Sequence, residues 1–198
     1  MNGPAWTIPE RTDTVGVVVT TPPVTRALTT SEAAVLALLA LGGEGSGYEL
    51  TKRVGRAIAH VWAPARSQLY ALLPRLVADG HVHARTVRQE TRPDKQVYTL
   101  TDDGRAALDA WLADESGGEA EFHLRLFVGS LVPTETLVGH VERFRAATAE
   151  RLEQYRRIEP TNTRAGADLF HWFELDRAIE RAEGDVAWAD RVLEELHR

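Results

Sequence analysis

Two capping boxes near the start of the chain most constrain its fold, because they define where two helices begin. In a capping box, a Ser or Thr side chain accepts a hydrogen bond from the helix backbone, and a Glu three residues later reaches back. Thr29 with Glu32 and Ser46 with Glu49 both match this pattern. Apolar residues at helical spacing follow each box. The first segment is apolar almost all round, which predicts a helix buried on most sides.

Residues 67–80 form a third predicted helix with two unlike sides. Its apolar stripe contains Leu69, Leu72, Leu73, Leu76 and Val77. At about 100° per residue, the opposite side carries only small residues, namely Ser67, Ala71, Pro74 and Ala78. A helix without bulky outward side chains can approach base edges in a DNA major groove, which is about 12 Å wide. Pro74 lacks an N–H group and is predicted to kink or strain this helix.

Two β-prone runs follow, at residues 81–89 and 96–100, around a polar tip that contains proline. This pattern predicts a hairpin, and Thr101 then caps a fourth helix. Three short helices, a hairpin and another helix predict a winged helix-turn-helix over residues 29–116. The chain is therefore expected to be mainly α with a small β-hairpin. Residues 1–28 hold four of the nine prolines and are expected to be a flexible N-terminal arm.

Polar and basic side chains gather at the start of the third helix. Gln68 can present both amide groups to adenine, and Arg66 can present its guanidinium to guanine or to a phosphate. The hydroxyls of Ser67 and Tyr70 can donate to phosphates. Further basic candidates lie off the apolar stripe of the second helix and around the hairpin tip, namely Lys52, Arg88, Arg92 and Lys95. We expect the hairpin residues to follow the DNA backbone, beside or within a minor groove.

Composition excludes several classes of protein. The net charge of −6 argues against a protein that coats nucleic acid indiscriminately. Most of this charge lies in residues 117–198, which contain 11 Lys and Arg but 16 Asp and Glu. The absence of cysteine excludes disulfides and thiolate zinc sites and suits a reducing, cytoplasmic location. The sequence contains no run of about 20 apolar residues, the length that a membrane-spanning helix needs.

The sequence contains no motif that indicates an enzyme, a cofactor or a metal. The glycine-rich stretch at residues 42–47 follows a helix and lacks the Lys of a phosphate-binding loop. Glu119 and His123, like His171 and Glu174, lack the Glu-x-x-His spacing and order of di-iron helical bundles. We therefore expect no catalytic residue, no cofactor and no metal.

Residues 117–198 are predicted to be helical, with helices near 120–131, 133–158 and 164–197. The last helix carries a broad apolar band that it cannot bury alone, containing Leu169, Trp172, Phe173, Ile179, Trp188, Val192 and Leu196. A second copy of the chain would cover the band and make this region a dimerisation and effector domain. Alternatively, Trp172 and Trp188 line a site for a flat aromatic effector.

Three segments resemble the PadR family of bacterial transcriptional regulators. They are "GYELTKRV" at 47–54, "SQLYALLPRLVADGHV" at 67–82 and "RPDKQVYTLTDDGRAALDAWL" at 92–112. The resemblance covers residues 30–115, and the remainder is similar only in length, helicity and aromatic content. It implies a homodimeric repressor that binds a palindromic operator in double-stranded DNA. It also implies DNA contacts by Tyr48, Ser67, Gln68, Tyr70, Arg92 and Lys95. The arm is longer than the family usually has.

The leading hypothesis is a sequence-specific DNA-binding transcriptional regulator, a homodimeric repressor released by an aromatic small-molecule effector. Two alternatives stay open. One is a winged-helix protein-interaction module that does not bind DNA, which the acidic charge and Pro74 favour. The other is a ligand-binding helical protein with an accessory winged helix.

Overall fold

The computed structural model describes residues 26–59, 62, 64–91, 93–158, 166 and 168–198. Residues 1–25 of the predicted arm therefore lie outside the described residues, as does Arg92, one of the predicted DNA-binding residues.

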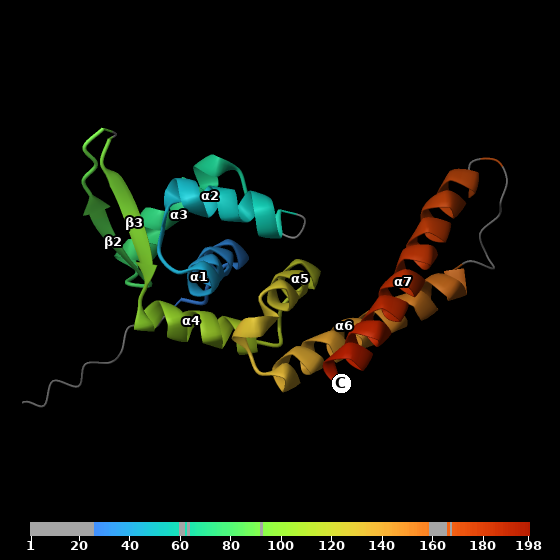
Figure 1. The fold of residues 1–198 in the computed structure, drawn as a ribbon. Coiled ribbons are helices and arrows are strands. Elements are labelled where there is room, and N and C mark those ends of the chain that lie inside the picture. Colours follow the sequence, from blue (N-terminus) through green and yellow to red (C-terminus); the bar gives the residue numbers. More distant parts are fainter. Residues whose placement is uncertain (1–25, 60–61, 63, 92, 159–165, 167) are drawn as a thin grey trace, which may run out of the picture.

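The first half of the chain is a winged helix, as predicted (Figure 1). Its elements are α1 (Thr30–Gly42), β1 (Gly45–Ser46), α2 (Gly47–Arg53), η1 (Val54–Ile58), α3 (Arg66–Ala78), β2 (Val82–Val87), β3 (Lys95–Leu100) and α4 (Asp102–Ala113). The predicted hairpin is β2 and β3, which form the wing. The structure adds a short third strand, because Gly45 and Ser46 pair with Tyr98 and Val97 of β3. The sheet order is β1-β3-β2, with antiparallel neighbours.

Both predicted capping boxes form. The Glu32 carboxylate accepts from the Thr29 backbone N–H at 2.9 Å, and the Glu49 carboxylate accepts from the Ser46 backbone N–H at 2.7 Å. The predicted burial of α1 is also confirmed, since every residue from Ala33 to Leu39 is buried. Helix α1 therefore lies at the centre of the winged-helix core, with α3, α4 and β3 around it.

Helix α3 has the two sides that its sequence predicts. Leu69, Leu73 and Leu76 are buried, whereas all four small residues of the opposite side are exposed. Val77 is an exception, because it is 36% exposed at the margin of the predicted stripe. The helix continues through Pro74 to Ala78. Because proline has no N–H, the Tyr70 carbonyl lacks its usual helical donor there.

The second predicted helix changes its winding part-way. The α-helix ends at Arg53, and one π-helical turn, Val54–Ile58, follows it. Helix α4 packs closely on the start of the wing. A Cβ on Gly104 would lie 2.0 Å from the His81 carbonyl oxygen, so only glycine allows this approach.

The second half is helical, with α5 (Glu119–Phe127), η2 (Gly129–Leu131), α6 (Thr134–Ile158) and α7 (Asp168–Leu196). Helices α6 and α7 form a long antiparallel pair that projects from the winged helix (Figure 1). Ion pairs join them, including Arg156 with Glu183 at 2.9 Å and Arg145 with Asp190. Helix α7 is continuous through Gly184. Within the described ranges, no helix combines the length and apolarity needed to cross a membrane.

Helix α5 contributes to two apolar clusters. Leu124, together with Val128 directly after the helix, belongs to the winged-helix core. Phe122 belongs to a second cluster with Val141 and Phe144 of α6 and Ala189 of α7. The domain division at residues 116 and 117 stays a prediction, and α5 packs on both sides of it.

Candidate nucleic-acid interface

The first turn of α3 presents Arg66, Ser67 and Gln68 to solvent. Ala65, which precedes the helix, has no side chain that could cap the unpaired N–H groups of this turn. Gln68 supplies a partner instead, since its Oε1 accepts from the Ala65 N–H at 3.1 Å. To present both amide groups to adenine, Gln68 has to release this hydrogen bond.

Tyr70 lies against the start of α2. A Cβ on Gly47 would lie 2.8 Å from Tyr70 Cε1, so the ring rests on bare glycine backbone. The Tyr70 side chain remains 46% exposed. Gly47 thus allows the aromatic ring to sit between α2 and α3 while part of it faces outward.

An exposed tyrosine on α2 is surrounded by positive charge. The Lys52 Nζ lies 4.7 Å from the centroid of the Tyr48 ring, a cation–π contact. The hydrogen bond from Lys52 and its charge lower the pKa of Tyr48, and the charges of Arg66 and Arg56 act in the same direction. Positive charges on α2, η1 and α3 therefore act on one phenol hydroxyl, which suits contact with a phosphate.

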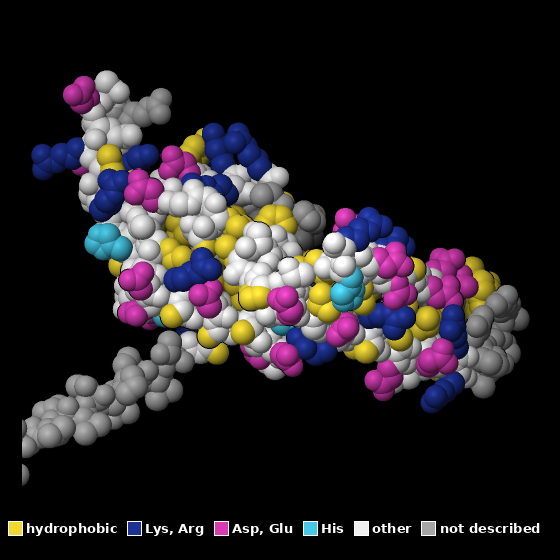
Figure 2. All heavy atoms as spheres, turned by 60° about the horizontal axis from the view of Figure 1, so that its bottom comes forward, with side chains coloured by type: hydrophobic (Ala, Val, Ile, Leu, Met, Phe, Trp, Pro, Cys, Tyr) yellow, Lys and Arg dark blue, Asp and Glu magenta, His cyan; other side chains and the backbone are white. Residues whose placement is uncertain are grey.

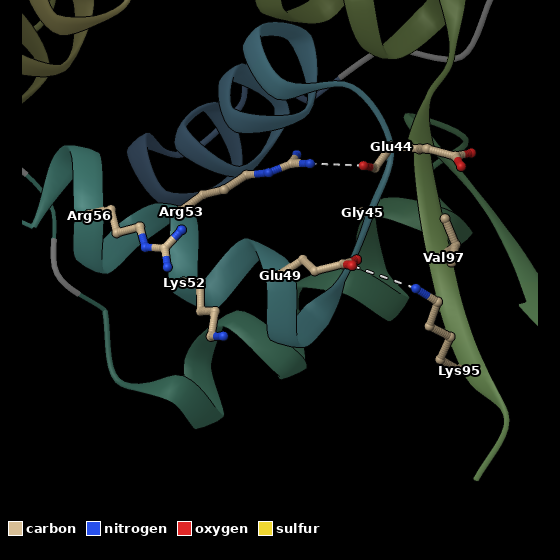
Figure 3. Close-up of a pocket in the computed structure, with 8 residues that line it drawn as sticks. All are labelled: Glu44, Gly45, Glu49, Lys52, Arg53, Arg56, Lys95 and Val97. Carbon is tan, nitrogen blue, oxygen red and sulfur yellow. Dashed lines mark hydrogen bonds and ion pairs between the residues drawn. The ribbon is translucent and has the colours of Figure 1, made fainter. Parts of the chain in front are cut away.

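The wing adds cations on the other side of the same surface. Lys95 on β3 lies with its Nζ 3.6 Å from the Glu49 Oε1 (Figure 3). Arg88 is exposed just after β2. A hollow of about 680 Å³ lies between α2, α3 and the wing. Four of the predicted DNA-binding residues line it, namely Tyr48, Lys52, Tyr70 and Lys95. Figure 2 shows Lys and Arg side chains gathered on the wing and the adjacent helices.

One basic residue near this surface has a structural role that sequence reasoning missed. Arg53 donates to the carbonyl oxygens of Gly43 and Glu44, each at 2.9 Å, and so satisfies acceptors at the end of α1. Figure 3 shows it pointing away from Lys52, toward Glu44. The glycine pair that ends α1 was the available signal, since such an end leaves carbonyls that need donors.

The predicted dimerisation and ligand residues fall into two groups. Trp188, Val192 and Leu196 pack within the subunit against the second apolar cluster. Trp188 meets Phe144 edge to face at a centroid distance of 5.9 Å. Leu169, Trp172, Phe173 and Ile179 lie on the first half of α7, where Phe173 is 51% exposed and neighbouring Phe170 is 69% exposed.

The described part of the chain contains no group of three or more His, Cys, Asp or Glu side chains placed to hold a metal ion.

An exposed third helix with small outward side chains, beside a basic wing, defines a winged-helix DNA-binding protein. Comparison with known families agrees with this class. The model of the transcriptional regulator PadR-like family matches residues 35–110. The model of the virulence activator alpha C-terminal family matches residues 120–197.

Two curated relatives cover most of the chain. A probable transcriptional regulator of Mycobacterium tuberculosis is 30% identical over 169 residues, which are 76% of this chain and 89% of that protein. The negative transcriptional regulator PadR of Bacillus subtilis is 28% identical over 172 residues, 81% of this chain and 93% of that protein. The crystal structure of B. subtilis PadR with operator DNA is 26% identical, covers 85% of this chain and 99% of its own, and superposes with a TM-score of 0.43. The chain belongs to the PadR-like family of transcriptional regulators.

Proposed function

We propose that this protein is a homodimeric repressor that binds a palindromic operator, not an enzyme. The observation that carries the proposal is the convergence of α2, α3 and the wing on one hollow lined by Tyr48, Lys52, Tyr70 and Lys95. Helix α3 enters a major groove, where Gln68 and Arg66 read base edges. Ser67, Arg88 and Arg92 join the four lining residues in contacting phosphates. A regulator of this kind acts where the chromosome is, in the cytoplasm.

The first half of α7 is the proposed dimer interface. Phe170 and Phe173 are both more than half exposed, and Ile158 at the end of α6 is 50% exposed. Leu169, Trp172 and Ile179 extend this apolar surface. A second copy of the chain covers it with the same surface, as two-fold symmetry requires. Such a dimer places its two recognition helices about 34–36 Å apart, one turn of DNA.

We place the aromatic effector at the junction of the two halves instead of between Trp172 and Trp188. Trp188 is engaged in packing on Phe144. A cavity of about 440 Å³ lies between α5, α6 and the end of α4. It is lined by the stacked rings of Phe122 and Phe144, by Arg143 and Arg151, and by the carboxylates of Glu115, Glu119 and Glu150. An aromatic carboxylate matches the rings, and it gains a guanidinium partner by displacing Glu115 from Arg143 or Glu119 from Arg151.

Footprinting of the purified dimer on the DNA upstream of its own gene tests operator binding directly. Repeating the footprint with aromatic carboxylates tests release by the effector. A protected palindrome supports the repressor assignment. A chain that protects no DNA but forms a stable complex with another protein is instead an interaction module.

Replacing Lys52 or Arg88 with alanine is expected to reduce the salt dependence of DNA binding. Each substitution removes one phosphate contact, so the slope of log K against log salt becomes shallower by about 1. Fluorescence anisotropy over a range of salt concentrations measures the slope. Arg105→Ala is the control, because Arg105 pairs with Asp109 on α4 and does not line the hollow between α2, α3 and the wing. Unaltered slopes in both variants would show that Lys52 and Arg88 do not contact phosphates.

Replacing Gly47 with alanine is expected to weaken operator binding more than it weakens the fold. The new methyl group clashes with the Tyr70 ring and displaces it, and the half-exposed ring can move outward. We expect a loss of affinity of about tenfold, which corresponds to about 1.4 kcal/mol. Thermal unfolding shows whether the fold is retained. Gly55→Ala is the matched control, because nothing lies within 4 Å of an added Cβ there. Equal affinities for the two variants would show that the position of Tyr70 is unimportant.

A further inference from the structure

The end of helix α4 is held by two buried side chains from the following helices. The last carbonyl groups of a helix have no partner within it. The Arg125 Nε on α5 donates to the Trp111 carbonyl oxygen at 3.3 Å, and the His140 Nε2 on α6 contacts the Leu112 carbonyl oxygen at 2.8 Å. Arg125 is 2% exposed and His140 is 5% exposed. These bonds tie the last helix of the winged domain to the helices behind it.

The partners of His140 determine which of its ring nitrogens carries hydrogen. The Arg143 Nη2 lies 2.8 Å from the His140 Nδ1. A guanidinium group can only donate, so Nδ1 accepts and the ring is neutral. The Nε2 therefore carries the hydrogen and donates to Leu112. Arg143 also pairs with Glu115, just beyond α4, at 3.0 Å.

Helices α5 and α6 are attached to the winged helix in different ways. Leu124 of α5 and Val128, directly after it, pack into the winged-helix core, and the Arg125 guanidinium lies 4.4 Å above the Trp111 ring. The contact of α6 with the end of α4 is polar, through His140 and Arg143. This polar contact lies where the winged helix meets the long α6–α7 pair (Figure 1).

We propose that His140, together with Arg125, is a positioning residue that sets the angle between the winged helix and the α6–α7 pair. Through this angle it sets the spacing between operator half-sites that the dimer accepts. The inference rests on the proposed function, because spacing has meaning only for a dimer on a palindrome. Helix α6 has 25 residues, so it is about 37 Å long at 1.5 Å per residue. A tilt of about 5° at one end of such a rod moves the other end by about 3.4 Å, the rise of one base pair.

The contact is also expected to respond to acid. Burial lowers the pKa of His140 below its ordinary value of 6.5. Arg143 and Arg125 lower it further, whereas the Leu112 carbonyl and Glu115 oppose the shift. Protonation of Nδ1 removes the acceptor of Arg143 and places a third cation beside two arginines. Because the neutral ring is favoured in the folded chain, the contact is intact above pH 6.5 and is lost as the pH falls through the lowered pKa.

The experiment measures binding to a series of operators whose half-site spacing is changed by one base pair at a time. The wild type is expected to prefer one spacing. His140→Leu removes the hydrogen bonds to Leu112 and from Arg143, and it is expected to reduce that preference by about tenfold or more. Affinity for a single half-site should not change, since α3 and the wing are untouched. His140→Gln can place an amide N–H near the position of Nε2. It is expected to restore the preference at pH 7.5 and to remove its dependence on pH. His197→Leu, at the exposed end of the chain, is the control.

The outcomes separate the two proposals. If the wild type protects no palindrome, the proposed function itself fails. If the wild type binds a palindrome but has no spacing preference, the positioning role is wrong. It is also wrong if a folded His140→Leu dimer has the same spacing profile as the wild type. If His140→Leu does not fold, the comparison of wild type with His140→Gln decides. Identical pH profiles for those two proteins would overturn the proposal, and a preference that is lost in acid only in the wild type would support it.

Discussion

Replacing Gln68 and Tyr70 together with alanine is expected to weaken operator binding about 300-fold. This loss combines roughly 2 kcal/mol for a bidentate base contact with roughly 1.5 kcal/mol for a hydroxyl bonded to a phosphate. The two losses differ in kind. Gln68 reads a base, so its removal lowers affinity for the operator but not for unrelated DNA. Tyr70 contacts the backbone, so its removal lowers affinity for both. Releasing Gln68 from the Ala65 N–H offsets part of its contribution.

Fluorescence anisotropy with operator DNA and with a scrambled duplex of the same length measures these losses at one fixed salt concentration. Tyr70→Phe keeps the ring that rests on Gly47 and removes only the hydroxyl. The matched control is the double variant Gln154→Ala and Tyr155→Ala, which removes the same two residue types from α6. An operator affinity within threefold of the wild type, in a folded double variant at residues 68 and 70, would exclude α3 as the reading element.

Replacing Glu32 with glutamine is expected to lower the free energy of unfolding by about 3 kcal/mol at pH 7. The Glu32 carboxylate is fully buried, and it accepts from Arg26 at 2.7 Å and from the Thr29 hydroxyl at 2.8 Å. Burial alone would raise its pKa. The bonds from Arg26 and Thr29 and the charge of Arg26 outweigh burial and lower the pKa from 4.5 to about 2. Glutamine keeps the size of the side chain but places an amide donor among these donors.

The difference in the free energy of unfolding between wild type and Glu32→Gln is expected to depend on pH. A carboxyl group with a lowered pKa stabilises the fold above its ordinary value, and this stabilisation is lost as the pH falls through the lowered value. The difference between wild type and Glu32→Gln should therefore be full above pH 4.5 and should disappear toward pH 2. Urea unfolding at a series of pH values measures it. Asp109→Asn, in the exposed pair with Arg105, should cost less than about 1 kcal/mol. A constant difference between wild type and Glu32→Gln across this range would show that Glu32 is not ionised in the fold.

Much of the winged helix could be predicted because its signals are local. A capping box acts over three residues, so Thr29 with Glu32 and Ser46 with Glu49 predicted two helix starts that the structure confirms. The two sides of α3 follow from helical geometry, and only Val77 lies outside its expected environment. The third strand was missed because two residues carry no periodicity.

The interface required the structure, because long side chains choose partners from other elements. Lys52, Arg53 and Arg56 look alike in the sequence, yet Arg53 satisfies carbonyl groups at the end of α1. Lys95 pairs with Glu49, a residue 46 positions earlier in the chain. Trp188 belongs to the same apolar band as Phe173, yet Trp188 packs inside the subunit and Phe173 faces solvent.

The sequence by itself determined the order of the elements, the slim outward side of α3 and the basic character of the wing. Each of these depends on residues within a few positions of one another. Only the tertiary structure decided that Arg53 satisfies carbonyl groups at the end of α1, that Lys95 pairs with Glu49, and that His140 holds the end of α4. Those contacts depend on the angles and distances between packed elements, which no local spacing encodes.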